Sequence, residues 1–168
     1  MVTSIGTGND RLEMLQDLIR LDHAAVEAYQ AAIERLDNDA WRQQLASFRN
    51  DHQRHIDELG PVVRQLGGEV PIDAGAKQLL AEGKVALGGL MDDTAILKAM
   101  RSNEADTNTA YERVAEKAPP EARDIVQRGL SDERRHCDWI LAQLDEDTTT
   151  LRTGQHRDTH RSDYRGGL

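Results

Sequence analysis

Apolar residues recur at intervals of three and four along most of this chain, the spacing that places side chains on one face of an α-helix. Four such stripes can be followed, over residues 12–36, 41–66, 96–114 and 125–144. Each stripe is long enough for several helical turns, and polar residues occupy most of the positions between the apolar ones. The pattern therefore predicts four long amphipathic helices and an all-α fold.

Helix-capping and helix-breaking residues separate the four stripes. The expected starts are Asn9 or Asp10, Asn38 or Asp39, and Asp92 or Asp93, which are residue types that cap helix N-termini. Gly67 should end the second helix, and Pro119 and Pro120 should end the third and open the fourth. Only a very short turn joins the first two helices, so these two must be antiparallel neighbours.

The stretch between Gly68 and Gly89 has a different character, because Pro71 and Gly75 interrupt it and only residues 76–87 suit a short helix. We interpret this stretch as a long crossover between helices two and three, which joins two helical hairpins. That connectivity distinguishes a ferritin-like antiparallel four-helix bundle from a simple up-and-down bundle.

The length of 168 residues suits a single domain, and the predicted bundle covers residues 9–146. Residues 1–8 should form an N-terminal arm. Residues 147–168 lack apolar periodicity and cannot offset the entropy of folding by burial, so we expect a disordered C-terminal tail. Charged residues make up 30% of the chain, which suits hydrated outer helix faces, and the four prolines are expected outside the long helices.

The formal net charge of −9 makes metal ions the expected charged partners and argues against nucleic acid or anionic lipid. Cys137 is the only cysteine, so no internal disulfide can form and a reducing compartment is expected. No apolar run approaches the roughly 20 residues of a membrane span, and residues 1–10 lack the pattern of a signal peptide. These features predict a cytoplasmic protein with no membrane partner.

Polar residues replace apolar ones near the middle of all four stripes. They are Asp22 in the first, His52 and His55 in the second, Asn103 at the centre of the third with Glu104 and Asp106 on its flanks, and Glu133 and His136 in the fourth. Because the helices are antiparallel, these middles lie at one level and the side chains converge. Several buried carboxylates are costly and repel one another, so a cation is their simplest partner. Imidazole and carboxylate ligands favour iron, manganese or zinc over calcium or magnesium.

Each inward residue also has a simpler explanation, because buried histidines and carboxylates form hydrogen-bonded networks without metal. Their occurrence together at one level favours the metal. The predicted ligands are Asp22, His52, His55, Glu104, Glu133 and His136. Tyr29 and Tyr111 could be redox partners, hydrogen-bond donors to the site or packed core residues, and Cys137 could be a small packed residue or a soft ligand.

Several segments resemble the ferritin-like superfamily, and within it the rubrerythrin-like proteins and their uncharacterised bacterial relatives. The segments read LDHAAVEAY, FRNDHQRH, MRSNEADTNTAY and DERRHCDWI, and the similarity covers about residues 12–144. Ferritin-like carboxylate sites take one Glu from each of two helices and a Glu-x-x-His pair from each of the other two. Glu133 and His136 match one such pair, and Asp22 followed by Tyr29 resembles the rubrerythrin-like first helix.

The second and third helices depart from this pattern. His52 stands where the resemblance implies a Glu, and an imidazole does not bridge two metals as a carboxylate does. The central position of the third helix is Asn103, a weak neutral ligand, with Glu104 beside it. A mononuclear or asymmetric site is therefore an alternative to a dinuclear one.

The resemblance implies a redox metalloprotein that handles iron or peroxide in a stress response, with mono- or dinuclear iron, or else manganese or zinc, as its cofactor. A homo-oligomer, a dimer or larger, is also expected. The alternative is a non-catalytic structural or assembly module with a structural metal or a metal-free His–carboxylate network. A complete rubrerythrin is not expected, because a single cysteine cannot supply the CxxC pairs of a rubredoxin-like iron centre.

Overall fold

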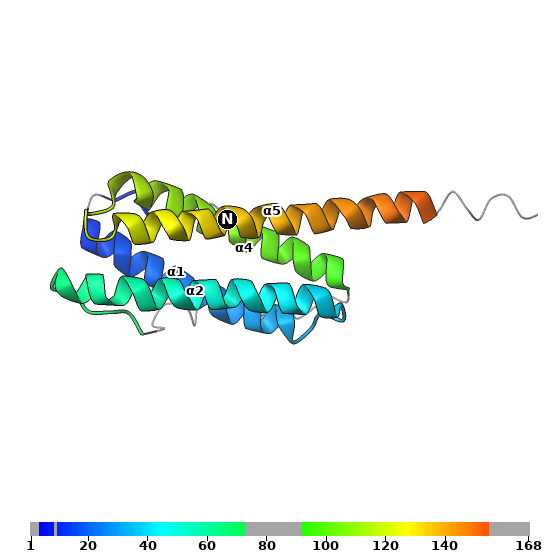
Figure 1. Ribbon diagram of the computed structural model, residues 1–168, viewed down its shortest axis with the longest axis horizontal. Helices are drawn as coiled ribbons and strands as arrows, with labels where there is room; N and C mark the ends of the chain where they lie inside the picture. The colour runs from blue at the N-terminus through cyan, green and yellow to red at the C-terminus, as the bar shows by residue number, and fades with distance from the viewer. Residues whose placement is uncertain (1–3, 9, 73–91, 155–168) are drawn as a thin grey trace, which may run out of the picture.

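The computed structural model describes residues 4–8, 10–72 and 92–154, and within them the chain forms four long α-helices (Figure 1). The helices are α1 (Arg11–Ile33), α2 (Asp39–Gln65), α4 (Asp93–Lys117) and α5 (Arg123–Gly154). The predicted all-α four-helix bundle is therefore confirmed. The short helix predicted over residues 76–87 lies outside the described residues.

Side-chain caps begin three of the helices at the predicted positions. Asp10, Asn38 and Asp92 each accept a hydrogen bond from a backbone amide in the first turn of the helix that follows. Just beyond the end of α2, Gly67 has a φ angle of +83°, a left-handed conformation that favours glycine. The sequence signals for the helix ends therefore act through ordinary capping geometry.

α2 contains Pro61, so the expectation that all four prolines lie outside the long helices is wrong. Proline has no amide hydrogen, and the carbonyl of Asp57 consequently receives no helical hydrogen bond from this position. Pro61 is exposed, and water can bond to the carbonyl on that face of the helix. α2 therefore continues past Pro61 as far as Gln65.

The four helices form two antiparallel hairpins, α1 with α2 and α4 with α5, which pack against each other (Figure 1). Across the two hairpins α1 contacts α4, and α2 contacts α5. At one end of the bundle, the carboxylate of Asp93 accepts hydrogen bonds from the backbone amides of Asp37 (2.9 Å) and Asn38 (2.8 Å). This contact ties the α1–α2 turn to the start of α4.

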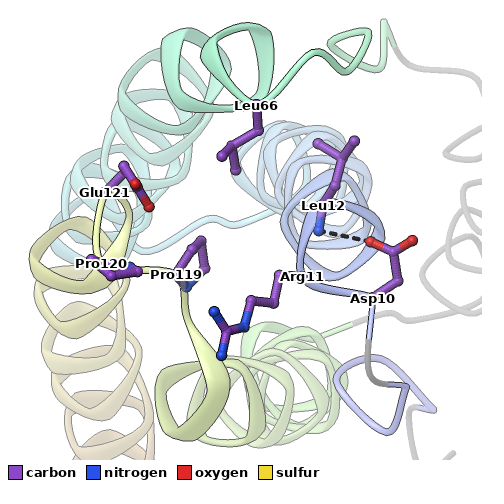
Figure 2. A pocket seen from close by; sticks show the side chains of 7 residues that line it. All are labelled: Asp10, Arg11, Leu12, Leu66, Pro119, Pro120 and Glu121. Carbon is purple, nitrogen blue, oxygen red and sulfur yellow. Dashed lines mark hydrogen bonds between the residues drawn. The ribbon is translucent and has the colours of Figure 1, made fainter.

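At the opposite end, the start of α1, the end of α2 and the α4–α5 turn surround one surface hollow (Figure 2). Leu12, Leu66 and Pro119 are among its lining residues, and none of the predicted metal ligands is. α2 therefore ends at this end of the bundle, whereas α4 begins at the other. The connection between them has to join opposite ends, which agrees with the predicted long crossover.

The described core consists of two apolar clusters, one toward each end of the bundle. α1 contributes Leu15 and Ile19 to one cluster and Tyr29 to the other, and the buried Asp22 lies between them in the sequence. The other three helices have the same order of apolar, polar and apolar residues. A polar layer therefore interrupts the core at mid-height, which is the level that the sequence predicts.

α5 continues to Gly154, beyond the helix end predicted near residue 146, and its last turns extend past the other three helices (Figure 1). Apolar periodicity reports the burial of a face, so it gives no signal for a helical end that projects from the bundle. Residues 155–168, the rest of the predicted disordered tail, lie outside the described residues. None of the helices described is both long and apolar enough to cross a membrane.

Candidate metal centre

Six of the predicted inward polar side chains meet between the two apolar clusters. They come from all four helices, and none is more than 2% exposed. They are Asp22 on α1, His52 and His55 on α2, Glu104 on α4, and Glu133 and His136 on α5. The predicted convergence of these side chains is therefore present in the structure, and their binding of a metal stays a prediction.

α4 contributes Glu104 and not Asn103 to the centre of this cluster. The prediction that Asn103 occupies the centre of the α4 stripe is wrong, because Asn103 is exposed whereas Glu104 is fully buried. The buried face of α4 includes Met100, Glu104 and Thr107. Because Thr107 is polar, a search for apolar residues does not include it, although its buried side chain shows which face of α4 points to the core. Asp106, the other predicted flanking residue, is only partly buried.

Two overlapping groups of four side chains offer ligand atoms close enough to hold a metal ion. The Asp22 group consists of Asp22, His52, His55 and Glu133, and the Glu104 group consists of His52, Glu104, Glu133 and His136. In each group one ligand atom from every residue lies within 4.8 Å of the others. Because His52 and Glu133 belong to both groups, the two candidate positions are adjacent.

The imidazole ring of His52 lies between the two groups. Its Nδ1 is 2.9 Å from Asp22 Oδ1 and 3.5 Å from Glu133 Oε1. Its Nε2 is 3.6 Å from Glu104 Oε1. One nitrogen of the ring therefore faces each group.

Each group also has a histidine of its own, with one ring nitrogen facing the group and the other facing outward. His55 Nδ1 lies 3.4 Å from a carboxylate oxygen of the Asp22 group, and His55 Nε2 lies 3.2 Å from Asp132 Oδ2. His136 Nδ1 lies 3.3 Å from a carboxylate oxygen of the Glu104 group, and His136 Nε2 lies 3.1 Å from Asp51 Oδ2. Histidines that bind metal through one nitrogen usually donate a hydrogen bond to a carboxylate from the other.

Two arginines hold these outer carboxylates in place. Arg54 donates to Asp51 (2.7 Å) and also to Asp132. Arg135 donates to Asp132 (2.8 Å) and to Asp51 (2.6 Å), so the four side chains form a closed ring of charges across α2 and α5. Burial alone would raise the pKa of Asp51, but hydrogen bonds from His136 and Arg54 lower it, and this carboxylate stays charged.

Asp132 is a contributor that the sequence reasoning missed, and a repeated pattern in the sequence marks it. Residues 51–55 read DHQRH and residues 132–136 read DERRH. Each segment supplies an outer Asp, a residue shared by both groups, an Arg of the charged ring and a histidine for one group. α2 and α5 are therefore equivalent parts of the site, although the shared residue is His52 in one and Glu133 in the other.

α1 and α4 show the same equivalence. Asp22 precedes Tyr29 by seven residues, and Glu104 precedes Tyr111 by seven. The Tyr111 hydroxyl donates a 2.7 Å hydrogen bond to Asp22 Oδ2 in the other hairpin, whereas the buried Tyr29 hydroxyl has no hydrogen-bond partner. The Tyr29 ring instead packs against His52, with ring centroids 5.4 Å apart. The hairpins thus form an approximate two-fold repeat with unequal tyrosines.

Gly129 on α5 makes room for the Tyr111 ring. A methyl group at Gly129 would lie 2.5 Å from an atom of that ring, so a larger residue would displace it. Burial, and then the charge of Asp22, raise the pKa of Tyr111 well above 10.0. Burial and the charge of Glu104 do the same for the pKa of Tyr29. Both phenols therefore keep their protons and serve as hydrogen-bond donors or packing groups near neutral pH.

Several of the atoms that face into the two groups lack hydrogen-bond partners. In the part of the chain that the structure describes, eight buried side-chain nitrogen and oxygen atoms are unpaired, and six of them belong to this cluster. They are both carboxylate oxygens of Glu104, both of Glu133, His52 Nε2 and His136 Nδ1. Some of these atoms lie at ion-pair distances from one another, but without hydrogen-bond geometry. Unpaired buried polar atoms are costly, and a cation at this place would pair them together.

Without a cation, protons have to compensate the buried charges. Burial raises the pKa of Glu133 well above 4.5, with a further contribution from the charge of Glu104 and against the effect of His52. Burial opposes the charged form of His52, but the surrounding acids, Glu133 first, raise the pKa of His52 well above 6.5. Burial would also raise the pKa of Glu104, but the imidazoles of His136 and His52 lower it to about 2. The raised pKa values of Glu133 and His52 favour protons on these two side chains, which would compensate part of the buried negative charge.

Cys137 lies outside both ligand groups. Its side chain is partly buried, and burial together with the charge of Glu104 raises the pKa of the thiol to about 12. The thiolate, which is the form that binds metal, is therefore rare near neutral pH. These properties favour a packing role over the alternative of a soft ligand.

Comparison with known proteins identifies a family for this chain. No curated protein matches the chain. The four-helix arrangement is consistent with a ferritin-like fold, although no family name confirms that relationship. A family model described as a domain of unknown function, DUF2383, matches residues 10–117, which include α1, α2 and α4 but not Glu133 and His136 on α5. Since the match covers more than half of the sequence, the chain belongs to the DUF2383 family.

Proposed function

We propose that this protein is a ferritin-like metal-binding protein that holds iron in its core and handles peroxide or related oxygen species. The observation that carries the proposal is the enclosed cluster of three carboxylates and three imidazoles, six of whose atoms lack hydrogen-bond partners. Manganese and zinc suit the same set of ligands.

The composition of the two groups supports a transition metal. Each group combines two imidazoles with two carboxylates, whereas calcium sites consist of oxygen ligands only. The outer carboxylates Asp51 and Asp132 support the same conclusion, because they fix the ring orientation of His136 and His55. The other ring nitrogen of each, Nδ1, faces into the ligand group.

The residues around the groups would define the chemistry of a bound ion. The two apolar clusters keep bulk water away, Glu133 supplies a negative charge to both groups, and Tyr111 fixes one oxygen of Asp22. Bound iron would supply the exchange of electrons with an oxygen species. The site would then be a buried redox centre between the two apolar clusters.

A second candidate function is a non-catalytic structural module, and the hydrogen bonds within the cluster favour it. His52 and Tyr111 both form hydrogen bonds with Asp22, and protons on Glu133 and His52 would compensate charge. Zinc, or no metal, would then be found in the purified protein. The ferritin-like resemblance alone supports a cytoplasmic homo-oligomer, which light scattering of the purified chain can test.

Elemental analysis of the full-length chain, purified without chelator from iron-supplemented cells, tests the proposal. We expect stoichiometric iron, and peroxide consumption that rises with iron content and disappears after chelation. Glu104→Gln should lower the iron content and the rate of peroxide consumption. Glu112→Gln alters an exposed carboxylate on the same helix and should change neither quantity. Zinc as the bound metal would support the structural module, and a chain free of metal would refute the metal site.

A further inference from the structure

His52 is the imidazole that both ligand groups share. Its Nδ1 faces Asp22 and Glu133 at 2.9 and 3.5 Å, and its Nε2 faces Glu104 at 3.6 Å. Nε2 is fully buried and has no hydrogen-bond partner. The two nitrogens lie on different edges of the ring, so one His52 side chain presents a nitrogen to each group, Nε2 without a partner and Nδ1 in a hydrogen bond with Asp22 that a bound cation would replace.

The internal repeat shows which residue His52 replaces. In the segments DHQRH and DERRH, His52 and Glu133 occupy the same position. Glu133 is also shared by both groups, and both of its oxygens lack hydrogen-bond partners. Each hairpin therefore supplies one residue that reaches both metal positions, an imidazole from α2 and a carboxylate from α5.

We propose that His52 bridges two divalent cations, with Nδ1 bound to the cation of the Asp22 group and Nε2 bound to the cation of the Glu104 group. The inference rests on the proposed function and specifies the number and spacing of its metal ions. Glu133 completes both groups from the opposite hairpin, and His55 and His136 are the terminal nitrogen ligands.

The charges of this arrangement balance within the enclosed cluster. Asp22, Glu104 and Glu133 supply three negative charges, and His52 supplies a fourth when both of its ring protons leave for the solvent. Two divalent cations carry four positive charges, so the buried centre is neutral. A single divalent cation would balance the three carboxylates only together with one proton, so the number of bound cations distinguishes the two arrangements.

An imidazole bridge also sets a characteristic distance between the two cations. Metal–nitrogen bonds of about 2 Å at each edge of the ring place the cations roughly 6 Å apart. Two-metal sites joined through oxygen ligands have separations of about 3.5–4 Å. The metal–metal distance therefore distinguishes a His52 bridge from a bridge made by a carboxylate alone.

Titration of the chelator-treated, full-length chain with Co²⁺ alone tests the inference. We expect two Co²⁺ per chain by elemental analysis. Anomalous diffraction from crystals of this complex should place the two ions roughly 6 Å apart, on either side of the His52 ring. This measurement uses the wild-type chain and does not depend on the folding of any variant.

Variants at position 52 provide the second part of the test. His52→Glu places at position 52 the residue type that the other hairpin has at Glu133. Two Co²⁺ should remain bound, while their separation shortens to about 3.5–4 Å. His52→Gln offers one good ligand atom in place of two, so binding should fall to about one Co²⁺ per chain. His23→Gln is the matched control, because His23 lies next to Asp22 in the sequence but contacts the carbonyl of Pro71 and neither group.

The possible outcomes separate this inference from the proposed function. One Co²⁺ per wild-type chain, or two Co²⁺ at 3.5–4 Å, overturns the bridging role of His52 and leaves the metal site in place. Unchanged stoichiometry in His52→Gln, with helical circular dichroism like that of wild type, overturns it as well. A wild-type chain that binds no Co²⁺ refutes the proposed function together with the bridge.

Discussion

Replacing Glu133 by Gln removes one negative charge from the centre of the cluster while it preserves the size of the side chain. Glu133 is fully buried, belongs to both ligand groups and has two oxygens without hydrogen-bond partners. The substitution should therefore weaken both metal positions at once. We expect metal affinity to fall by more than the roughly 10–100-fold loss that is typical for residues that only support a ligand.

The same substitution should stabilise the metal-free protein. Burial raises the pKa of Glu133 well above 4.5, so the folded chain keeps a proton that the unfolded chain releases. Each pH unit above 4.5 over which Glu133 keeps this proton costs about 1.4 kcal/mol of folding free energy. Gln needs no proton, but its poorly paired buried amide costs about 1–3 kcal/mol. The net expectation is that the metal-free variant becomes more stable than metal-free wild type as pH rises above 4.5, by a margin that grows with pH.

The assay compares wild type, Glu133→Gln and Glu112→Gln, the last being an exposed carboxylate on α4. Bound metal is measured by elemental analysis, and the free energy of unfolding is measured in urea with and without chelator. Unchanged metal occupancy in Glu133→Gln would refute the anchoring role of this residue. Absence of metal from wild type, together with a loss of about 1–3 kcal/mol in the variant, would indicate a metal-free network instead.

Three further predictions follow from the same contacts. The raised pKa values of His52 and Glu133 stabilise the metal-free fold fully below their ordinary values of 6.5 and 4.5, and this contribution is lost as pH rises through the folded-state values. The urea midpoint measured in chelator should therefore fall between pH 6 and pH 9, and a rise would contradict the assignment. Tyr111→Phe should lower the free energy of unfolding by about 1.5–3 kcal/mol, because it removes a buried hydrogen bond to a carboxylate. Tyr29→Phe should lower it by less than about 0.5 kcal/mol, because the Tyr29 hydroxyl has no hydrogen-bond partner. Equal losses for the two variants in urea unfolding would show that the difference in partners is unimportant. Removal of residues 147–168 should change the thermal stability by less than about 0.5 kcal/mol, since this segment has no apolar stripe, and a large loss of helical circular dichroism would show the opposite.

The helices could be predicted from the sequence because each of their features has a local cause. Apolar side chains at helical spacing have to share one face, and Asp10, Asn38 and Asp92 cap the first turns that they precede. Features without a buried face gave no such signal. The projecting end of α5 is one example, and Pro61, which lies within α2 on an exposed face, is another.

The position of the site along the helices could be predicted more reliably than the identity of its ligands. Buried charges at mid-helix identify the polar layer, but choosing between Asn103 and Glu104 requires the direction of the α4 core to within one residue, about 100° of rotation. Thr107 settles that direction only after its burial is known. Asp132 lies at the margin of the α5 stripe, so helical periodicity does not select it; comparison of DHQRH with DERRH would have done so.

The contacts around the cluster would hold its side chains together without a metal. Metal sites in small zinc-dependent domains form only when the metal itself drives folding. Here two extensive apolar clusters hold the helices on both sides of the polar layer, and the ring of Arg54, Arg135, Asp51 and Asp132 fixes α2 against α5. Protons on the central residues supply the missing positive charge. Binding of cations would then replace protons within the cluster, so metal affinity should increase with pH while the fold itself remains the same.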